Sequence, residues 1–253
     1  MRRFLGSAVH RVLDRFGYIL VKRNFARFGY SLFTDVRRIS RTWGWSVETV
    51  FDVGANVGQF ATETLRGLPG ATVYSFEPHP GAFAELSRLS GPQLKTHELA
   101  LAAEPGEATL YVYGSETETS LINSLTPNAR FPQKFGFEPH EVKVRCATVD
   151  AFCQEAGIER IDLLKVDTEG FDLVVLRGAE RMLREGRVRF VYVEFNDLFA
   201  RAGTTGGALV PIAEYLDPFG FSYLCTYTDF VLYEGRVSVC ANALFSVSPV
   251  EAQ

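Results

Sequence analysis

The chain has 253 residues, 47% hydrophobic and 22% charged, and a formal net charge of -4. This length allows one large domain or two small ones, and the composition is that of an ordinary folded protein, which excludes global disorder. Residues 1–45 contain ten Lys or Arg against two acids, so the rest of the chain is acidic. We interpret the basic leader mainly as the solvated face of a helix, with contact to anionic lipids as the alternative.

The sequence contains neither a secretory signal nor an evident metal-binding cysteine motif. Arg11, Asp14 and Arg15 interrupt the first apolar stretch too early for a signal peptide, and no run reaches the roughly 18 apolar residues of a transmembrane helix. No cysteine pair has CxxC spacing, so structural zinc is disfavoured. The four cysteines are Cys146, Cys153, Cys225 and Cys240. We expect a cytoplasmic protein, with peripheral membrane contact through the basic leader as an option.

The N-terminal segment is predicted to be helical because its apolar residues recur at three- and four-residue spacing. These positions are Leu5, Val9, Val12, Leu13, Phe16, Ile19 and Leu20. A second short helix around 35–42 leads to the first strand. We therefore expect an N-terminal basic helical extension over residues 1–45 and one folded domain over residues 46–253.

From residue 49 onward, strand and helix signals alternate, which is typical of parallel strands joined by crossover helices. The predicted strands are Thr49–Val53, Thr72–Phe76, Leu94–Leu99, Ile161–Val166 and Phe190–Phe195. The predicted helices are Gln59–Leu65, Pro80–Leu89 and Phe171–Leu183. Because these strands are almost continuously apolar, we expect a mostly parallel, Rossmann-like α/β sheet with helices on both faces.

Residues 107–149 break this alternation. Ala108–Tyr113 and Val142–Ala147 read as two strands of an inserted hairpin with a long loop, and such loops often act as functional lids. We expect three aromatic residues of the loop to pack the insertion onto the domain rather than to form a platform for a sugar. These residues are Phe131, Phe135 and Phe137.

The end of the chain is predicted to be antiparallel. A helix at Leu209–Leu216 is followed by three strand-like runs that lie too close together for crossover helices. The runs are Phe221–Tyr227, Phe230–Tyr233 and Val239–Val247.

The most informative stretch is VFDVGANVGQF, residues 50–60, in which an apolar strand is followed by an acid, two glycines and a helix. Gly54 and Gly58 allow a sharp turn, and the helix offers free N–H groups at its start. A dinucleotide fingerprint would require glycine at Asn56 and Gln59 instead. Asp52 would repel a pyrophosphate but suits the cationic amino-acid end of S-adenosylmethionine. The electrostatics therefore favour a sulfonium cofactor over a nicotinamide one.

A second acid, Glu77, ends the next predicted strand and is suited to accept hydrogen bonds from both ribose hydroxyls. The chain here resembles the FkbM-type S-adenosylmethionine-dependent methyltransferases over about residues 50–247. The matching blocks, in order, are DVGANVGQ (52–59), FEP (76–78), TSL (119–121), TVD (148–150), LKVDTEG (164–170) and VE (193–194). The resemblance implies a class I methyltransferase fold and O-methylation of a hydroxyl on a sugar, glycolipid or secondary-metabolite acceptor. The candidate cofactor-binding residues are Asp52, Gly54, Ala55, Asn56, Gly58, Gln59, Glu77, Pro78, Ala100 and Ser120.

Candidate catalytic residues end the strands that should face the transferred methyl group, because ligands of such sheets sit beyond the strands' carboxyl ends. Asp167 is the first candidate for the general base and Glu194 the second. Lys165 either lowers the pKa of the acceptor hydroxyl or pairs structurally with Asp167. His79 and His140 are weaker candidates for the base, since loop histidines are usually just solvated.

A divalent cation is a further option that the spacing does not favour, so no metal site is predicted. Its oxygen ligands would be Asp167, Glu169, Glu194 and Asn196. Ser120 in the insertion is placed to contact cofactor or acceptor when the loop closes.

Two other functions remain open: a nicotinamide-dependent oxidoreductase, and a binding module that kept the fold without the chemistry. The acidic main domain disfavours a nucleic-acid partner. We expect a small-molecule or glycan acceptor. The sequence does not determine the oligomeric state.

Overall fold

The computed structural model describes residues 28–113, 123, 125, 139–196, 198, 207–233 and 236–248, with side chains left out at 229–240. The predicted leader helix, its proposed membrane contact, Ser120 and the three insertion phenylalanines lie outside these residues. The described α-helices are α2 (Leu32–Trp43), α3 (Gln59–Gly67), α4 (Pro80–Ser87), α6 (Val149–Ala156), α7 (Asp172–Arg177), α8 (Glu180–Arg184) and α9 (Leu209–Leu216). A 3-10 turn, η2 (Asp217–Phe219), follows α9. None of the described helices is both long and apolar enough to cross a membrane.

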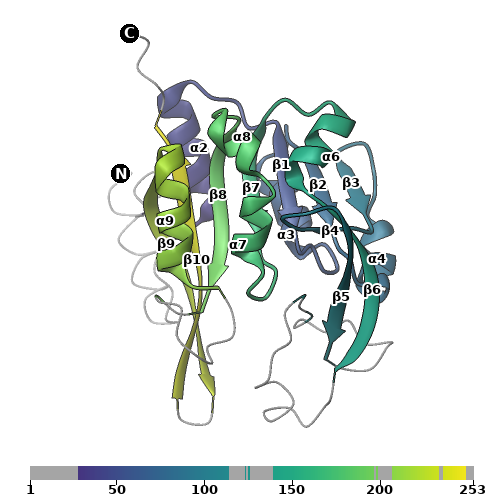
Figure 1. Ribbon diagram of the computed structural model, residues 1–253. Helices are drawn as coiled ribbons and strands as arrows, with labels where there is room; N and C mark the ends of the chain where they lie inside the picture. Colours follow the sequence, from purple (N-terminus) through teal and green to yellow (C-terminus); the bar gives the residue numbers. More distant parts are fainter. Residues whose placement is uncertain are drawn as a thin grey trace, which may run out of the picture.

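A seven-stranded sheet forms the centre of the molecule (Figure 1). Its spatial order is β3 (Leu94–His97), β2 (Thr72–Phe76), β1 (Thr49–Val53), β7 (Ile161–Val166), β8 (Val188–Phe195), β10 (Arg236–Val247) and β9 (Phe221–Tyr233). The first five strands are parallel, whereas β10 is antiparallel to both β8 and β9. The predicted mostly parallel sheet with an antiparallel C-terminal strand is confirmed.

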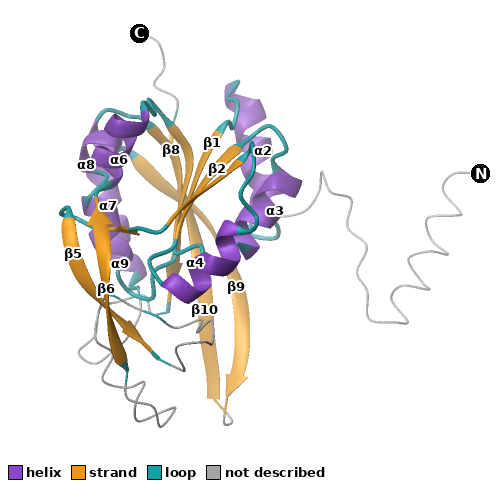
Figure 2. Cartoon of the chain, turned by 90° about the vertical axis from the view of Figure 1, so that its right-hand side faces the viewer, coloured by secondary structure: helices purple, strands orange, loops and turns teal. Residues whose placement is uncertain are grey.

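Helices cover both faces of the sheet, with α2 and α3 on one side and α6 to α9 on the other (Figure 2). Every residue of β7 is buried, as the continuous apolar pattern predicts. One core includes Phe51, Leu176 and Met182 on the α6–α9 side, and the other includes Val36 and Phe190 on the α2 side. Each such large side chain contributes roughly 1.5–3 kcal/mol by leaving water.

Helix α2 belongs to this packing rather than extending freely from it. Leu32, Val36 and Ile39 are buried in the core on its side of the sheet. The carboxylate of Asp35, which is also buried, accepts hydrogen bonds from the Gly29 N–H and the Tyr227 hydroxyl, both at 2.9 Å. The described part of the predicted extension is therefore bound to the sheet by both apolar and polar contacts.

Helix Phe171–Leu183, predicted as one element, is two helices in the structure. The chain passes so close to a neighbouring loop at Gly178 that an added Cβ would lie 2.0 Å from the Ala102 carbonyl oxygen. Gly178 lies between the end of α7 at Arg177 and the start of α8 at Glu180. Helix α6 was not predicted; it begins at the N-cap Thr148, whose side chain accepts a hydrogen bond from the Ala151 N–H.

The insertion forms a second sheet of three strands, ordered β4 (Ala100–Leu101), β6 (His140–Ala147) and β5 (Gly106–Val112). Strands β5 and β6 are antiparallel, which confirms the predicted hairpin. The predicted strand Leu94–Leu99 instead ends at His97, and the chain then pairs in the second sheet. The β5–β6 and β9–β10 hairpins project from the edge at which β8 ends (Figure 1).

Candidate functional site

A cavity of about 300 Å³ lies at the carboxyl ends of the parallel strands. It adjoins β1, whose neighbours are β2 on one side and β7 on the other, so it sits at the point where the strand order reverses. Its lining residues are Val53, Gly54, Ala55, Asn56, Gln59, Phe60, Phe76, Glu77, Pro78, Leu99, Ala100, Leu101, Leu110, Asn123, Leu125, Lys165, Asp167, Thr168, Glu169, Tyr192, Glu194 and Asn242. Most of the candidate site residues are therefore gathered around one cavity.

Lys165 is held under this cavity by carboxylates and carbonyls. It is directly opposite Asp52 in the β1–β7 pairing, and its Nζ lies 3.1 Å from Asp52 Oδ1 and 3.5 Å from Asp167 Oδ2. Nζ also donates to the Gly54 carbonyl at 2.8 Å. Burial lowers the pKa of the Lys165 ammonium, but the charges of Asp52 and Asp167 outweigh it and raise the pKa. Lys165 is thus charged and paired with two carboxylates and a backbone carbonyl. Of its two predicted roles, the geometry favours structural pairing over lowering the pKa of the acceptor hydroxyl.

Asp52 does not line the cavity, in contrast to its predicted direct contact with the cofactor. Its side chain is 0% exposed, and it is bound by Lys165 and by the Ser75 hydroxyl. The carboxylate ends up beneath the loop because Asp52 still belongs to β1, with side chains from β2 and β7 on either side. Its charge is therefore compensated within the protein.

The turn after β1 requires glycine for a steric reason. Gly54 has a φ of 74°, and a Cβ there would lie 1.9 Å from the Asp167 carbonyl oxygen. Gly58 has a φ of 88° but does not line the cavity, because it faces Leu86 and Leu89 of the α4 region. The missing Cβ of Gly58 lets α3 approach α4 closely, and its predicted cofactor contact stays a prediction.

Glu77 joins the loop after β1 to the loop after β2. Its two carboxylate oxygens accept hydrogen bonds from the Asn56 N–H at 2.8 Å and the His79 N–H at 2.9 Å. Burial raises the pKa of Glu77, although these two backbone donors act in the opposite direction. Glu77 also lines the cavity, and each carboxylate oxygen has a further lone pair, so Glu77 can accept from a diol such as a ribose.

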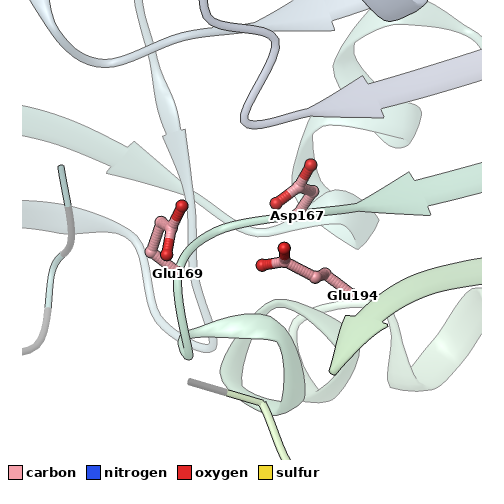
Figure 3. A group of neighbouring side chains, drawn as sticks. All are labelled: Asp167, Glu169 and Glu194. Carbon is pink, nitrogen blue, oxygen red and sulfur yellow. The ribbon is translucent and has the colours of Figure 1, made fainter. Parts of the chain in front are cut away.

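Three carboxylates converge at the other end of the cavity, from the carboxyl ends of β7 and β8 (Figure 3). One oxygen of each of Asp167, Glu169 and Glu194 lies within 4.8 Å of the others. Burial, followed by the charges of Glu194, Asp167 and Asp172, raises the pKa of Glu169 to about 9. Glu169 is therefore protonated at neutral pH, as expected where like charges cannot all ionise.

Asp172 holds the loop that carries Glu169 by hydrogen bonds to its backbone. It is buried, and its oxygens accept hydrogen bonds from the Thr168 and Gly170 N–H groups at 3.3 and 3.2 Å. Burial and the charge of Asp167 raise its pKa to about 7. The sequence analysis did not identify Asp172 as part of the site. The sequence signal that could have indicated it is an acid at the first position of a predicted helix, two residues after Gly170.

Three of the four residues considered as cation ligands are brought together, while Asn196 is exposed and lies outside the cavity lining. Neighbouring carboxylates are also common without a metal, so the cation stays an alternative. Neither His79 nor His140 lines the cavity. His79 instead caps α4, where its Nδ1 accepts from the Ala82 N–H.

The cavity residues that the sequence analysis did not single out include Phe60, Asn123, Tyr192 and Asn242. Asn242 is opposite Glu194 in the antiparallel β8–β10 pairing. Phe60 and Tyr192 stack with ring centroids 6.1 Å apart. The sequence signal of Phe60, Tyr192 and Asn242 is weak, because strand pairing or helix packing brings them to the cavity. Asn123 lies in the connection between β5 and β6 and belongs to no local motif.

Three polar atoms buried at the cavity have no hydrogen-bond partner among the described residues. They are the Oδ1 atoms of Asn56 and Asn123 and the Oγ1 atom of Thr168. Buried polar groups in folded proteins are almost always hydrogen-bonded, so such atoms indicate a place where a ligand supplies the partner. Together with Glu77 and the glycine turn, they fit a ligand that is both polar and nucleotide-like.

This strand order, with an antiparallel strand between the last two parallel ones and a cavity at the switch point, defines a class I methyltransferase fold with a nucleotide-type cofactor site. The family model of the methyltransferase FkbM domain matches residues 52–223. The chain belongs to the FkbM methyltransferase family, and the prediction of this family is confirmed.

Several similar proteins are methyltransferases by name, which agrees with the family assignment. The chain is 31% identical over 204 residues to the 31-O-demethyl-FK506 methyltransferase FkbM of Streptomyces tacrolimicus, covering 69% of this chain and 73% of the relative. It is 28% identical over 155 residues to the 2-O-methyltransferase NoeI of Sinorhizobium fredii, covering 58% and 63%. It is 32% identical over 150 residues to Methyltransferase 1 of Beauveria bassiana, covering 52% and 58%. The chain thus spans about six tenths of the length of the latter two.

Proposed function

We propose that this protein transfers a methyl group from S-adenosylmethionine to a hydroxyl oxygen of a sugar, glycolipid or secondary-metabolite acceptor. Membership of the FkbM family supports methyl transfer. The names of two relatives, a 2-O-methyltransferase and a 31-O-demethyl-FK506 methyltransferase, support oxygen as the methylated atom. The observation that carries the proposal is the switch-point cavity, with Glu77 bridging two loops beside buried polar atoms that lack partners.

The two ends of the cavity suit the two ends of this cofactor. Pro78, Leu99 and Ala100 form a largely apolar end beyond β2 and β3, which suits a purine base. The opposite end has Asp167 and Glu194, whose negative charge suits an ammonium and a sulfonium. Glu77 follows β2, which lies between β3 and β1 in the sheet. It is therefore placed between these two ends, where it can accept hydrogen bonds from the ribose.

The residues proposed to contact the cofactor directly are therefore fewer than those of the sequence motif. They are Gly54, Ala55, Asn56, Gln59, Glu77, Pro78 and Ala100. Asp52 and Gly58 act indirectly, the first by anchoring Lys165 and the second by allowing α3 to approach α4. Ser120 stays a candidate outside the described residues.

Acceptor activation needs a group that takes the hydroxyl proton. The cofactor supplies an activated methyl carbon; the acceptor oxygen forms the new bond to that carbon as the carbon–sulfur bond breaks, and the bonding electrons stay on sulfur. Asp167 is the first candidate for the proton acceptor, because one of its oxygens pairs with Lys165 at 3.5 Å and leaves the other for the hydroxyl. Glu194 is the second, and it faces the same space.

The charge of the cavity also bears on the acceptor. Its carboxylates would repel phosphate groups, which supports a neutral hydroxylated acceptor and disfavours a nucleic-acid backbone. Phe60 and Tyr192 add a stacked aromatic wall on the α3 side of the same cavity. Aromatic faces of this kind suit the apolar face of a ring-shaped acceptor.

The test is a calorimetric titration of S-adenosylmethionine, S-adenosylhomocysteine and NAD into the purified full chain, with and without magnesium. We expect the first two to bind and NAD to give no heat. Binding of NAD alone would overturn the proposal in favour of an oxidoreductase. Binding of the two methyl-transfer ligands would justify measuring transfer of a labelled methyl group to hydroxylated sugars and macrolides.

A further inference from the structure

The inserted three-stranded sheet supplies one wall of the cofactor cavity. Ala100 comes from β4 and Leu110 from β5, and both belong to the small apolar cluster of this sheet. Leu125, from the connection between β5 and β6, packs against the same cluster. The insertion thus encloses the apolar end of the cavity, the end assigned to the purine base.

Among the described residues of the β5–β6 connection, Asn123 adds a polar group to this apolar wall. It lies two residues before Leu125 and lines the cavity. Its Oδ1 is buried and has no hydrogen-bond partner among the described residues. A buried carbonyl oxygen without a donor is unfavourable, so this position calls for a ligand with an N–H or O–H group.

The position of Asn123 selects which part of the cofactor can supply that donor. The proposed function assigns the ribose hydroxyls to Glu77, whose oxygens are already oriented by the Asn56 and His79 N–H groups. The ammonium suits the carboxylates at the far end of the cavity. The remaining part of the cofactor is the adenine ring. Its exocyclic amino group is its one strong hydrogen-bond donor, because the rest of the ring consists of C–H groups and nitrogen acceptors.

We propose that Asn123 recognises the adenine base by accepting a hydrogen bond from its exocyclic amino group, so that the inserted sheet sets the base specificity of the cofactor site. This inference rests on the proposed function, since it concerns the base of the same cofactor. Specificity of this kind follows from pairing: a base that places an acceptor opposite Asn123 Oδ1 leaves two buried oxygens facing each other.

The test compares two ligands that differ at that one position. S-Adenosylhomocysteine carries the amino donor, whereas S-inosylhomocysteine carries a carbonyl oxygen in its place. Isothermal calorimetry on the full wild-type chain should give roughly tenfold to hundredfold tighter binding of the adenosyl ligand, the range expected for replacing a buried hydrogen bond by an unpaired acceptor. Equal affinity for the two ligands would overturn the proposal.

Two variants locate the effect at Asn123. Asn123→Ala should weaken the adenosyl ligand and bring the ratio of the two affinities close to one. Asn123→Asp keeps an acceptor oxygen and should retain the preference for the adenosyl ligand. Gln154→Ala, the loss of a side-chain amide at an exposed residue of α6 outside the cavity, should leave both affinities unchanged.

The outcomes separate this inference from the proposed function. If Asn123→Ala keeps the wild-type ratio while its thermal unfolding is unchanged, base recognition does not involve Asn123, although the cofactor assignment stands. If Asn123→Ala does not fold, equal affinity of the two ligands for the wild type or for Asn123→Asp would still overturn the inference. If the wild-type chain binds neither ligand, the proposed function fails together with this inference.

Discussion

The Lys165 ammonium lies 3.1 Å from Asp52 Oδ1, with both side chains almost completely buried. The two residues are partners in the β1–β7 register, at the centre of the sheet. Nζ also donates to the Gly54 carbonyl, so the pair fixes the turn that forms one wall of the cavity. Asp52, the acid of the glycine-turn motif, therefore holds the turn indirectly, through a lysine on a strand more than a hundred residues later in the sequence.

Removing this lysine should destabilise the protein. Lys165→Met would leave Asp52 buried without its counter-charge, at a cost of about 3–5 kcal/mol in the free energy of unfolding. Urea unfolding followed by circular dichroism measures this cost. The double variant Asp52→Asn with Lys165→Met should recover most of the loss, and a double variant as unstable as Lys165→Met would contradict the ion-pair explanation.

Shortening Glu77 should weaken the cofactor site. Glu77→Ala removes the acceptor for the Asn56 and His79 N–H groups and the proposed acceptor for the ribose. We expect the dissociation constant of S-adenosylhomocysteine to rise about tenfold or more, as for the loss of charged hydrogen bonds. Calorimetry measures this change, and Glu85→Ala on an exposed face of α4 is the matched control. Unchanged affinity in Glu77→Ala would remove Glu77 from the site.

Neutralising the proposed base should separate binding from turnover. Asp167→Asn keeps the shape of the side chain, so binding of S-adenosylhomocysteine should change little. Methyl transfer should fall by about 10²–10⁴, the usual contribution of a general base. Transfer of labelled methyl to an accepted hydroxyl compound measures the rate. A rate equal to that of the wild type would shift the role to Glu194.

The raised pKa of Glu169 should make stability depend on pH. Glu169 has a folded-state pKa of about 9, raised from 4.5 by burial and then by neighbouring carboxylates. The folded state therefore holds a proton that the unfolded state releases between about pH 4.5 and 9. Its contribution to stability is complete below pH 4.5 and is lost as the pH rises towards 9, with a limiting slope of about 1.4 kcal/mol per pH unit.

Replacing Glu169 should remove that dependence. Glu169→Gln resembles the protonated form, so we expect it to be more stable than the wild type at pH 8 and similar at pH 4.5. Urea unfolding at four or five pH values gives the two curves. Parallel curves for the two proteins would mean that Glu169 is ionised in the folded state.

The glycine turn offers a steric test. Gly54→Ala would place a Cβ 1.9 Å from the Asp167 carbonyl oxygen, so the ends of β1 and β7 would have to separate. We expect a loss of several kcal/mol, beyond the roughly 1 kcal/mol cost of a positive φ. Gly157→Ala is the control, because its φ of 67° is similar and an added Cβ meets nothing within 4 Å. Equal losses in the two variants would show that the close approach is unimportant.

The sequence by itself determined the parallel sheet, the family and most of the cavity residues after β1 and β2. Apolar strands are recognisable because β7, for example, is buried at all six positions. The turn from Gly54 to Gln59 and the acid Glu77 are local signals, since their spacing follows from one strand–helix–strand unit. Such features depend on short stretches of chain and can be read from them.

Only the tertiary structure decided which groups touch the cavity and which support it. Asp52 is beneath the loop because Lys165 lies opposite it across two parallel strands. Asn242 is opposite Glu194 through antiparallel pairing, and the chain at Gly178 passes close to the carbonyl of Ala102, where a Cβ would not fit. These effects arise from contacts between segments far apart in sequence, where register and steric fit, rather than local periodicity, set the position of each side chain.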